Sequence, residues 1–236
     1  MGVVALVPAA GRGERLGYGM PKALVPVDGV PLLVRAVRGL LVSGRVRHVV
    51  IAAPPSDVDI VSTVTAPLAT ADGAVHVVAG GAERSDSVRL ALTYALREIP
   101  DTSIVLVHDA ARAFTPPSVV DAVVDAVAAG HAAVVPVLPV ADTVKQVDAG
   151  GVVVATPDRA ALRVVQTPQG FAADVLRRAH EAAHAEGLGA TDDAGLVERL
   201  GVPVITVPGH PDGMKITTRF DLAVAEALLA GSGGAP

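Results

Sequence analysis

Short apolar runs alternate with longer amphipathic segments along most of the chain. Several of the runs are apolar at successive positions, as is typical of strands covered on both faces. We expect strands at Val3–Pro8, His48–Ala53, Val75–Ala79, Ser103–Val107, Ala132–Val137 and Val202–Val207. Helical periodicity predicts helices at Leu32–Val42, Ser85–Ile99, Ser118–Ala129, Ala173–Glu186 and Asp192–Leu200, and a last helix after Thr218. This alternation predicts an α/β fold with a mainly parallel twisted sheet and flanking helices.

One segment interrupts the alternation. Asp142–Val147 and Val152–Thr156 read as two strands around a Gly-rich turn. The segment has few apolar residues to bury on both faces, so we expect a projecting β-arm at about residues 139–160. Projecting arms commonly pack on another subunit, which favours a homodimer, although an ordinary edge hairpin is the alternative. Residues 1–230 are expected to form one domain, and residues 231–236 a disordered tail.

Composition narrows the class of protein. The 236 residues are 51 % apolar but only 2 % aromatic, so Ala, Val, Leu and Ile must supply the core. The absence of Cys excludes disulfides, thiolate metal sites and cysteine catalysis. A net charge of −5 disfavours a general nucleic-acid binder. No apolar run is long enough for a membrane span, and the N-terminus lacks the charged start of a secretory signal. A soluble cytoplasmic protein is expected.

The first loop carries the features of a phosphate site. In open α/β sheets ligands bind beyond the carboxyl ends of the strands. The first strand runs into Pro8-Ala9-Ala10-Gly11-Arg12-Gly13, and Arg15 and Lys22 follow. Small residues let a ligand approach the backbone, and glycines permit a loop that surrounds an anion. A Gly-rich loop without a ligand is the alternative. The glycine spacing does not fit a dinucleotide fingerprint, and Lys22 does not fit a Walker loop.

Two further loops offer polar groups at strand ends. Gly80 and Gly81 open a helix that carries Ser87 in its first turns, which suits an anion or is simply a helix cap. Asp109 follows a buried strand and suits a metal or a ribose hydroxyl, and Arg112 suits a phosphate. An Asp–Arg ion pair is the structural alternative, and His108 is expected to be structural. The C-terminal half adds Asp158-Arg159, Gln166-Thr167-Pro168-Gln169, Thr191-Asp192-Asp193 and Met214-Lys215-Ile216-Thr217.

Taken in order, these motifs resemble a known family. They are Pro-Ala-Ala-Gly-x-Gly-x-Arg, Pro-Lys, Gly-Gly-x-x-Arg-x-x-Ser-Val, Val-His-Asp-Ala-Ala-Arg, Asp-Thr-x-Lys, Thr-Pro-Gln-x-Phe, Thr-Asp-Asp and Lys-Ile-Thr. The set spans Val4 to about Leu229 and resembles the 2-C-methyl-D-erythritol 4-phosphate cytidylyltransferases of the non-mevalonate isoprenoid pathway. The first motif alone occurs across nucleotidyltransferases, and the ribitol 5-phosphate cytidylyltransferases share most of the set.

The resemblance implies a Rossmann-like domain whose β-arm exchanges between the subunits of a homodimer. It also implies an enzyme that transfers CMP from CTP to 2-C-methyl-D-erythritol 4-phosphate. The products would be 4-diphosphocytidyl-2-C-methyl-D-erythritol and pyrophosphate. Magnesium, or another divalent cation, would be held mainly by the CTP phosphates rather than by a protein metal site. No nucleic acid and no membrane would be a partner.

The resemblance also implies roles for single residues. It assigns catalysis to Arg15, Lys22, Arg159 and Lys215, and nucleotide binding to Pro8, Ala9, Ala10, Gly11, Gly13, Gly81, Ser87, Asp109 and Ala110. The acceptor sugar phosphate would be bound by Arg112, Thr143, Arg159, Thr167, Thr191 and Lys215, with Thr143 and Arg159 reaching in from the partner's arm. Members of the family often carry an acidic residue where this chain has Ala82. Cytosine recognition would therefore depend on backbone groups and Ser87.

The chemistry agrees with these residue types. A phosphate monoester is already an anionic nucleophile, so the reaction needs cations and positioning rather than a Ser, Cys or general base. Three alternatives remain: a ribitol 5-phosphate enzyme, a nucleotidyltransferase for another substrate such as a molybdopterin, and a nucleotide-binding regulator without catalysis. The arm motif at Asp142–Lys145 and Thr167-Pro168-Gln169 disfavour the second. Arg15 together with Lys22 counts against the third, and the glycine spacing excludes an NAD dehydrogenase.

Overall fold

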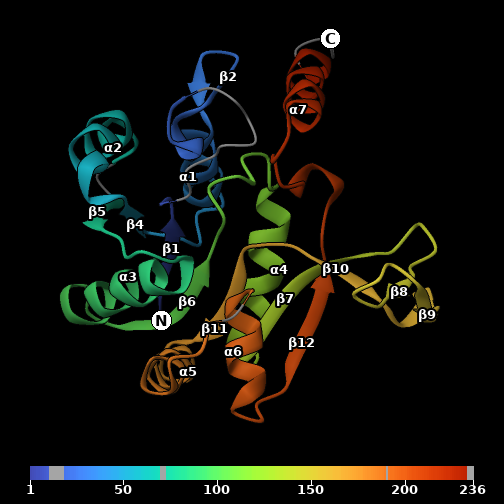
Figure 1. Ribbon diagram of the computed structural model, residues 1–236. Helices are drawn as coiled ribbons and strands as arrows, with labels where there is room; N and C mark the ends of the chain where they lie inside the picture. Colours follow the sequence, from blue (N-terminus) through green and yellow to red (C-terminus); the bar gives the residue numbers. More distant parts are fainter. Residues whose placement is uncertain (11–18, 70–72, 190, 233–236) are drawn as a thin grey trace.

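The structure is a computed structural model and describes residues 1–10, 19–69, 73–189 and 191–232. These residues are organised around a mixed sheet of eight strands. Its strands lie in the order β10-β7-β11-β6-β1-β4-β5, and β12 also pairs with β7 (Figure 1). Their bounds are β1 (Gly2–Pro8), β4 (His48–Ala53), β5 (Ala74–Ala79), β6 (Thr102–Val107), β7 (Ala133–Pro139), β10 (Arg163–Val165), β11 (Gln169–Ala172) and β12 (Val204–Pro208). The predicted α/β fold is confirmed.

The sheet is mainly parallel, as predicted, but two of its strands run antiparallel to their neighbours. The pairs β1–β4, β1–β6, β4–β5 and β7–β12 are parallel. Strands β10 and β11 run antiparallel to β7, and β11 also runs antiparallel to β6. Neither of these two strands was predicted from the sequence. They are only three and four residues long and are separated by Gln166, Thr167 and Pro168, so they show no extended apolar run.

Helices cover both faces of the sheet. On one face lie α3 (Arg84–Glu98), α5 (Ala173–Glu186) and α6 (Asp193–Arg199), and on the other lie α1 (Leu32–Val42), α2 (Val58–Thr65) and α4 (Pro117–Ala128). Successive residues of β1 point to opposite sides: Leu6 joins the core beneath α3 and α5, while Ala5 and Val7 join the core beneath α1 and α4. This two-sided burial explains the continuous apolar strands. Helix α2 was not predicted.

A smaller cluster anchors the C-terminal helix, α7 (Arg219–Ser232), against a short hairpin of β2 (Pro26–Val27) and β3 (Val30–Pro31). Thr218 and Asp221 form a reciprocal cap at its start. The Asp221 N–H donates to Thr218 Oγ1 over 3.2 Å, and the Thr218 N–H donates to Asp221 Oδ2 over 2.7 Å. Capping of this kind satisfies amides that the helix leaves unpaired.

The last helix extends beyond the predicted end of the domain. Helix α7 includes Gly231 and Ser232, so assigning these two residues to a disordered tail was wrong. The rest of that tail, residues 233–236, lies outside the described residues. Among the helices that the structure describes, none combines the length and the apolar character needed to cross a membrane.

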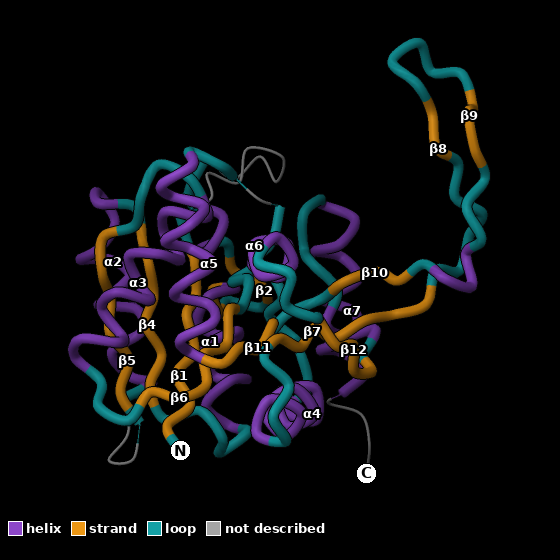
Figure 2. The backbone as a smooth tube through the Cα atoms, turned by 90° about the horizontal axis from the view of Figure 1, so that it is seen from below, coloured by secondary structure: helices purple, strands orange, loops and turns teal. Residues whose placement is uncertain are grey.

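The predicted β-arm leaves the body between β7 and β10 (Figure 2). Its strands, β8 (Gln146–Val147) and β9 (Val153–Ala155), are shorter than predicted. The turn between them is held by Asp148 Oδ1, which accepts the N–H groups of Gly150 and Val152 over 2.9 Å each. Val152 and Val154 are 62 % and 56 % exposed. The projecting hairpin is therefore confirmed, and the homodimer stays a prediction.

Candidate active site

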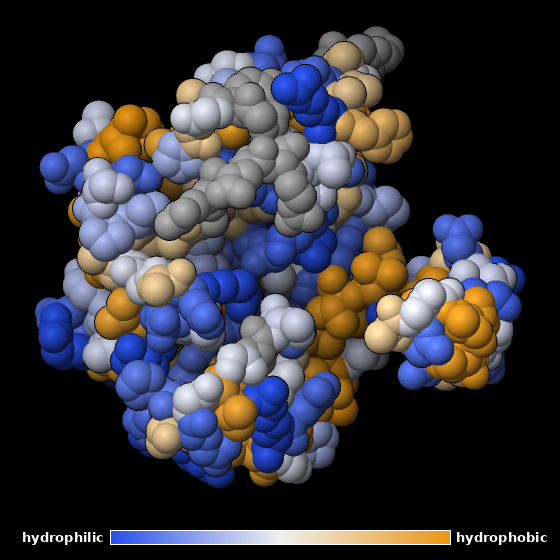
Figure 3. Space-filling view, in the orientation of Figure 1, coloured by the Kyte–Doolittle hydropathy of each residue, from blue (hydrophilic) through white to orange (hydrophobic). Residues whose placement is uncertain are grey.

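Three of the loops singled out from the sequence meet at the carboxyl edge of the sheet. The Ala9 N–H donates to the Ala52 carbonyl over 2.8 Å, and the Gly80 N–H donates to the Ala53 carbonyl over 2.7 Å. These bonds hold the loops after β1 and β5 against the end of β4. A Cβ added to Gly81 would lie 2.2 Å from the Asp86 Cβ, so this close approach requires glycine. Figure 3 shows hydrophilic surface gathered in a hollow of the face seen in Figure 1.

Asp109 is the centre of a charge cluster at this edge. Lys215 Nζ lies 2.8 Å from Asp109 Oδ2, Arg84 Nε lies 3.4 Å from Oδ1, and Arg112 Nε lies 3.8 Å from Oδ2. Burial pushes the pKa of Asp109 upward, but the charges of Arg84, Lys215 and Arg112 outweigh it and lower the pKa to about 2. The carboxylate is therefore ionised near neutral pH and holds these cations around one point.

Arg84 extends the cluster toward the helices. Its NH1 atom lies 2.8 Å from Asp193 Oδ2, and His180 Nε2 lies 2.9 Å from Asp193 Oδ1. Burial pushes the pKa of Asp193 upward, but the hydrogen bond from His180 and the charge of Arg84 outweigh it, so the pKa is lowered. Arg84 and Asp193 both lie inside the quoted motifs, yet sequence analysis assigned neither to the site. His180 lies outside every motif and gave no signal.

Arg112 binds main chain rather than standing free. Its NH1 donates to the Gly213 carbonyl over 2.7 Å and its NH2 to the Val165 carbonyl over 3.2 Å. Its Nε is buried without a hydrogen-bond partner among the described residues. Arg112 thus ties the loop before Lys215 to strand β10. Its predicted contact with the acceptor phosphate stays a prediction.

Thr167 and His108 fix the backbone beneath Asp109. The Asp109 N–H donates to Thr167 Oγ1 over 3.0 Å, and His108 Nε2 lies 3.2 Å from the Arg112 carbonyl. Since a carbonyl only accepts, Nε2 carries the imidazole proton, and Nδ1 accepts from the Thr167 hydroxyl over 3.0 Å. Burial lowers the pKa of His108 to about 4. His108 is therefore neutral and holds the loop in place, which agrees with the structural role expected for it.

Ser87 holds the Gly-rich loop after β5. Its hydroxyl is fully buried, donates to the Glu83 carbonyl over 3.0 Å and accepts from the Gly81 N–H over 3.2 Å. The hydroxyl proton is therefore already used within the loop, which leaves an acceptor lone pair for any ligand. The predicted contact between Ser87 and the base stays a prediction.

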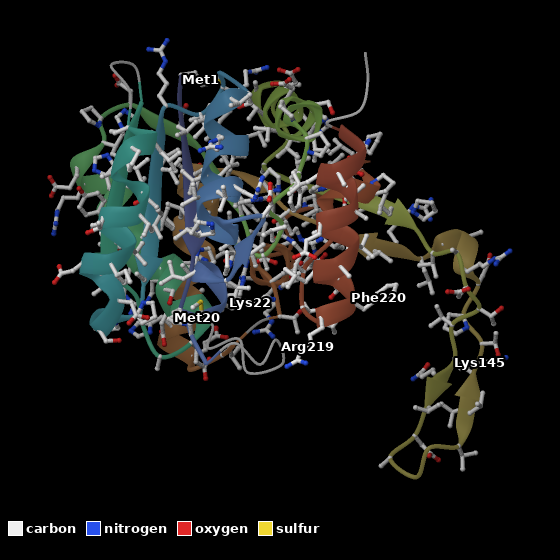
Figure 4. All side chains as sticks on the ribbon, turned by 90° about the horizontal axis from the view of Figure 1, so that it is seen from above. Met1, Met20, Lys22, Lys145, Arg219 and Phe220 are labelled. Carbon is white, nitrogen blue, oxygen red and sulfur yellow. The ribbon has the colours of Figure 1, made fainter. Side chains whose placement is uncertain are left out.

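The remaining predicted residues lie at the rim, on the arm or outside the described ranges. Lys22 is half-buried at the start of a short 3-10 turn, at the edge where Figure 4 also labels Met20 and Arg219. Pro8 ends β1, Ala10 follows Ala9 and is half-buried, and Ala110 is buried next to Asp109. Gly11, Gly13 and Arg15 lie outside the described residues.

One subunit does not bring the arm residues to Asp109. Thr143 is exposed on the arm, and Arg159 NH1 donates to the carbonyl of Ala141, at 2.6 Å, within the arm itself. The arm projects from the body, and Figure 4 shows Lys145 far out on it. Thr191 is exposed just before α6. Among the described residues of one chain, the cluster therefore joins Asp109 with Arg84, Arg112, Thr167 and Lys215.

Comparison with known proteins decides the family. The family model described as 2-C-methyl-D-erythritol 4-phosphate cytidylyltransferase matches residues 3–231. The chain belongs to this cytidylyltransferase family. The resemblance inferred from the ordered motifs is thereby confirmed, together with the prediction of a nucleotidyltransferase.

Relatives that carry the cytidylyltransferase name match nearly the whole chain. A protein of that name from Saccharopolyspora erythraea is 69 % identical over 230 residues, which are 98 % of this chain and 100 % of the relative. One from Frankia casuarinae is 57 % identical over 97 % of this chain and 81 % of its own length.

Solved cytidylyltransferase structures share the fold. The enzyme from Thermus thermophilus is 38 % identical, with a TM-score of 0.78 over 98 % of this chain and 100 % of its own. A 4-diphosphocytidyl-2C-methyl-D-erythritol synthase from Anaerococcus prevotii is 26 % identical, with a TM-score of 0.83 over 97 % of this chain and 98 % of its own. The predicted mainly parallel sheet with flanking helices agrees with these neighbours.

Proposed function

We propose that the protein transfers CMP from CTP to 2-C-methyl-D-erythritol 4-phosphate, releasing pyrophosphate, and supplies isoprenoid precursors by the non-mevalonate route. The observation that carries this proposal is the cluster of Arg84, Arg112 and Lys215 around Asp109, at the carboxyl edge of a chain that matches the family over residues 3–231. Residues 1–230 act as one nucleotidyltransferase domain, and the enzyme works in the cytoplasm.

The nucleotide occupies the β1 and β5 sides of this edge. Small residues from Pro8 to Gly11 and the Gly81 loop let the base and ribose approach backbone amides, and Ala110 lies beside the ribose. Asp109 is ionised, so it can accept a hydrogen bond from a ribose hydroxyl. Arg15 and Lys22 stabilise the charge that develops on the α-phosphate. Gly13 is assigned to nucleotide binding by the resemblance to the family.

The acceptor occupies the β6, β11 and α6 side. Lys215 is 44 % exposed although its ammonium contacts Asp109, so it can also meet a phosphate. Arg112, Thr167 and Thr191 line the same side, and the partner subunit of a homodimer adds Thr143 and Arg159 from its arm. Two anions must meet for the acceptor oxygen to attack the α-phosphorus and displace pyrophosphate. Fixed cations lower the cost of that encounter, and no general base is required.

Magnesium enters with the nucleotide. Within the described residues no three His, Asp or Glu side chains gather as metal ligands would, and Asp109 is already paired with cations. These residues do not form a cage for a resident cation, but they suit a triphosphate that carries Mg²⁺ on its own oxygens. When bound there, Mg²⁺ neutralises phosphate charge.

The deciding assay measures pyrophosphate release from CTP with each of two acceptors. We expect rapid release with 2-C-methyl-D-erythritol 4-phosphate and Mg²⁺, and slow release with ribitol 5-phosphate. Faster turnover of ribitol 5-phosphate would assign the protein to that related activity. CTP binding without turnover of either acceptor would indicate a regulator and overturn the proposed function.

A further inference from the structure

His180 lies on α5, outside the charge cluster, and belongs to none of the motifs that predict the site. Its side chain is 3 % exposed, and its Nε2 lies 2.9 Å from Asp193 Oδ1. Asp193 is 1 % exposed at its side chain and uses its other oxygen, Oδ2, to bind Arg84 NH1 over 2.8 Å. Both oxygens of one buried carboxylate are therefore occupied, one by the helix α5 imidazole and the other by the guanidinium.

This arrangement fixes the direction in which Arg84 points. A guanidinium is planar, so a bond from NH1 to Asp193 sets the plane in which its Nε–H lies. That Nε lies 3.4 Å from Asp109 Oδ1. A carboxylate held by only one donor can rotate about its side-chain torsions, whereas one held at both oxygens cannot. The order of contacts is thus His180, Asp193, Arg84, Asp109.

We propose that His180 is a positioning residue for CTP binding. It acts through Asp193 and Arg84 on the orientation of Asp109, the carboxylate assigned above to the ribose. This inference rests on the proposed function for its choice of nucleotide. It adds a role for a buried histidine that touches neither substrate, and it places the support for the nucleotide site in the layer of helices.

The same helix provides a matched control. His180 and His184 stand one turn apart on α5, and both line a cavity of about 170 Å³ between α3 and α5. His184 is exposed and, among the described residues, makes no hydrogen bond or ion pair with Asp193 or Arg84, so the same substitution there changes the cavity without touching the chain of contacts.

The experiment compares His180→Leu, His180→Gln and His184→Leu. Leucine fills the space but cannot donate to Asp193, whereas the glutamine amide can place a donor near the position of Nε2. We expect His180→Leu to weaken CTP binding, measured by titration calorimetry, about tenfold, as loss of a hydrogen bond to a charged group predicts. His180→Gln and His184→Leu should bind CTP like the wild type. At saturating CTP, the KM for the acceptor should stay unchanged in all three variants.

Each outcome bears on the proposal. Wild-type CTP affinity in His180→Leu, an equal loss in His184→Leu, or an equal loss of affinity for CTP and acceptor would overturn it. If His180→Leu does not fold, Asp193→Asn provides the test, because it keeps the side-chain size but leaves one acceptor oxygen for the two donors, and the same tenfold loss is expected. The calorimetry needs no acceptor, so a protein that binds CTP but fails to transfer CMP would contradict the proposed function while this comparison still decides the role of His180.

Discussion

The side chains at the carboxyl edge of the sheet are paired within one subunit, whereas the apolar side chains of the β-arm are exposed to solvent. At the edge, the Asp109 side chain is 12 % exposed and contacts three cations of the same chain, one from its own loop and two from other segments. On the arm, Val152 is 62 % exposed, and the side chain of Arg159 donates to the Ala141 carbonyl and to no other group among the described residues. The edge is organised by its own subunit, whereas the arm leaves its apolar side chains uncovered.

This difference indicates how nucleotide binding and acceptor binding would be divided between the subunits of a homodimer. A two-stranded hairpin is marginally stable alone, so apolar side chains on it gain stability only when another surface covers them. The cations at the edge need no such cover, because buried partners already hold them. A homodimer would combine a preorganised nucleotide side from one subunit with acceptor ligands from the arm of the other.

Mixing two inactive variants provides the strongest test. Lys22→Met and Arg159→Ala should each lower the rate by roughly 10²–10³, because each removes a preorganised charge. If Arg159 serves the partner's site, a mixed dimer contains one site with both substitutions and one with neither. After subunit exchange at equal amounts, about a quarter of wild-type activity should return for a two-fold symmetric dimer. The measurement is pyrophosphate release.

The matched control mixes Lys22→Met with Lys215→Met. Both residues belong to the body of the subunit, so every site in a mixed dimer carries one substitution and activity should stay low. An arm that acts on its own subunit would leave the first mixture equally inactive.

Charges on the arm should break the dimer while leaving the edge intact. We expect Val152→Lys combined with Val154→Lys to destabilise dimerisation by about 3 kcal/mol or more, because each buried valine contributes at least 1.5 kcal/mol or so. Light scattering measures the dissociation, and circular dichroism measures whether the subunit stays folded. The control pair is Val42→Lys with Ile60→Lys, at positions that are 68 % and 51 % exposed on the body. A dimer that survives the arm substitutions would contradict the proposed interface.

The neutral His108 should make the edge sensitive to acid. Its folded-state pKa is lowered to about 4 from 6.5, so below pH 6.5 the unfolded chain takes up a proton that the folded chain does not. The contribution of His108 to the free energy of unfolding is complete above pH 6.5 and falls by up to about 3 kcal/mol as the pH drops to 4. Denaturant unfolding measures it. His108→Gln should remove this dependence of the free energy of unfolding on pH, whereas His131→Gln, at an exposed position, should leave it unchanged. An unchanged pH dependence in His108→Gln would contradict the lowered pKa of His108 in the folded protein.

The smallest expected effect concerns the Gly-rich loop. Ser87→Ala removes the acceptor for the Gly81 N–H and a donor to Glu83, so the loop that meets the base loses order. The preference for CTP over UTP should fall about fivefold, which corresponds to roughly 1 kcal/mol for one lost hydrogen bond. Ratios of kcat/KM for the two nucleotides measure this. Ser85→Ala, two residues earlier in the same turn, is the control, and an equal ratio in wild type and Ser87→Ala would remove Ser87 from base recognition.

The pattern of apolar residues predicts the parts of the fold that are long and uniform. Helices Leu32–Val42 and Ala173–Glu186 have the bounds predicted from periodicity, because each presents a continuous apolar stripe to the sheet. Strand β11 was missed because four residues within a polar motif carry no periodic signal, and its place between β6 and β7 depends on contacts far apart in sequence.

The same limit applies to the site. Asp109 and Lys215 are recognisable because charged residues stand at strand ends or inside an ordered motif, and the structure joins them at 2.8 Å. His180 lies in the middle of an amphipathic helix, where the sequence does not distinguish a histidine that supports a site from any other polar residue. Only the packing of α5 on α6 places it against Asp193, so no local pattern could reveal it.

The arm also has a consequence for how this protein can be redesigned. Its two ends meet at one register pair, Arg163 opposite Pro139, so the arm is an excursion between residues that are already neighbours in the sheet. Closing a longer or shorter loop between fixed ends changes the chain entropy only slowly. The arm can therefore be lengthened, shortened or exchanged for the arm of a relative without shifting any strand that carries the charge cluster. The length of the arm and the folding of the body are thus separable, but an exchanged arm must keep Thr143 and Arg159, the residues proposed to bind the acceptor.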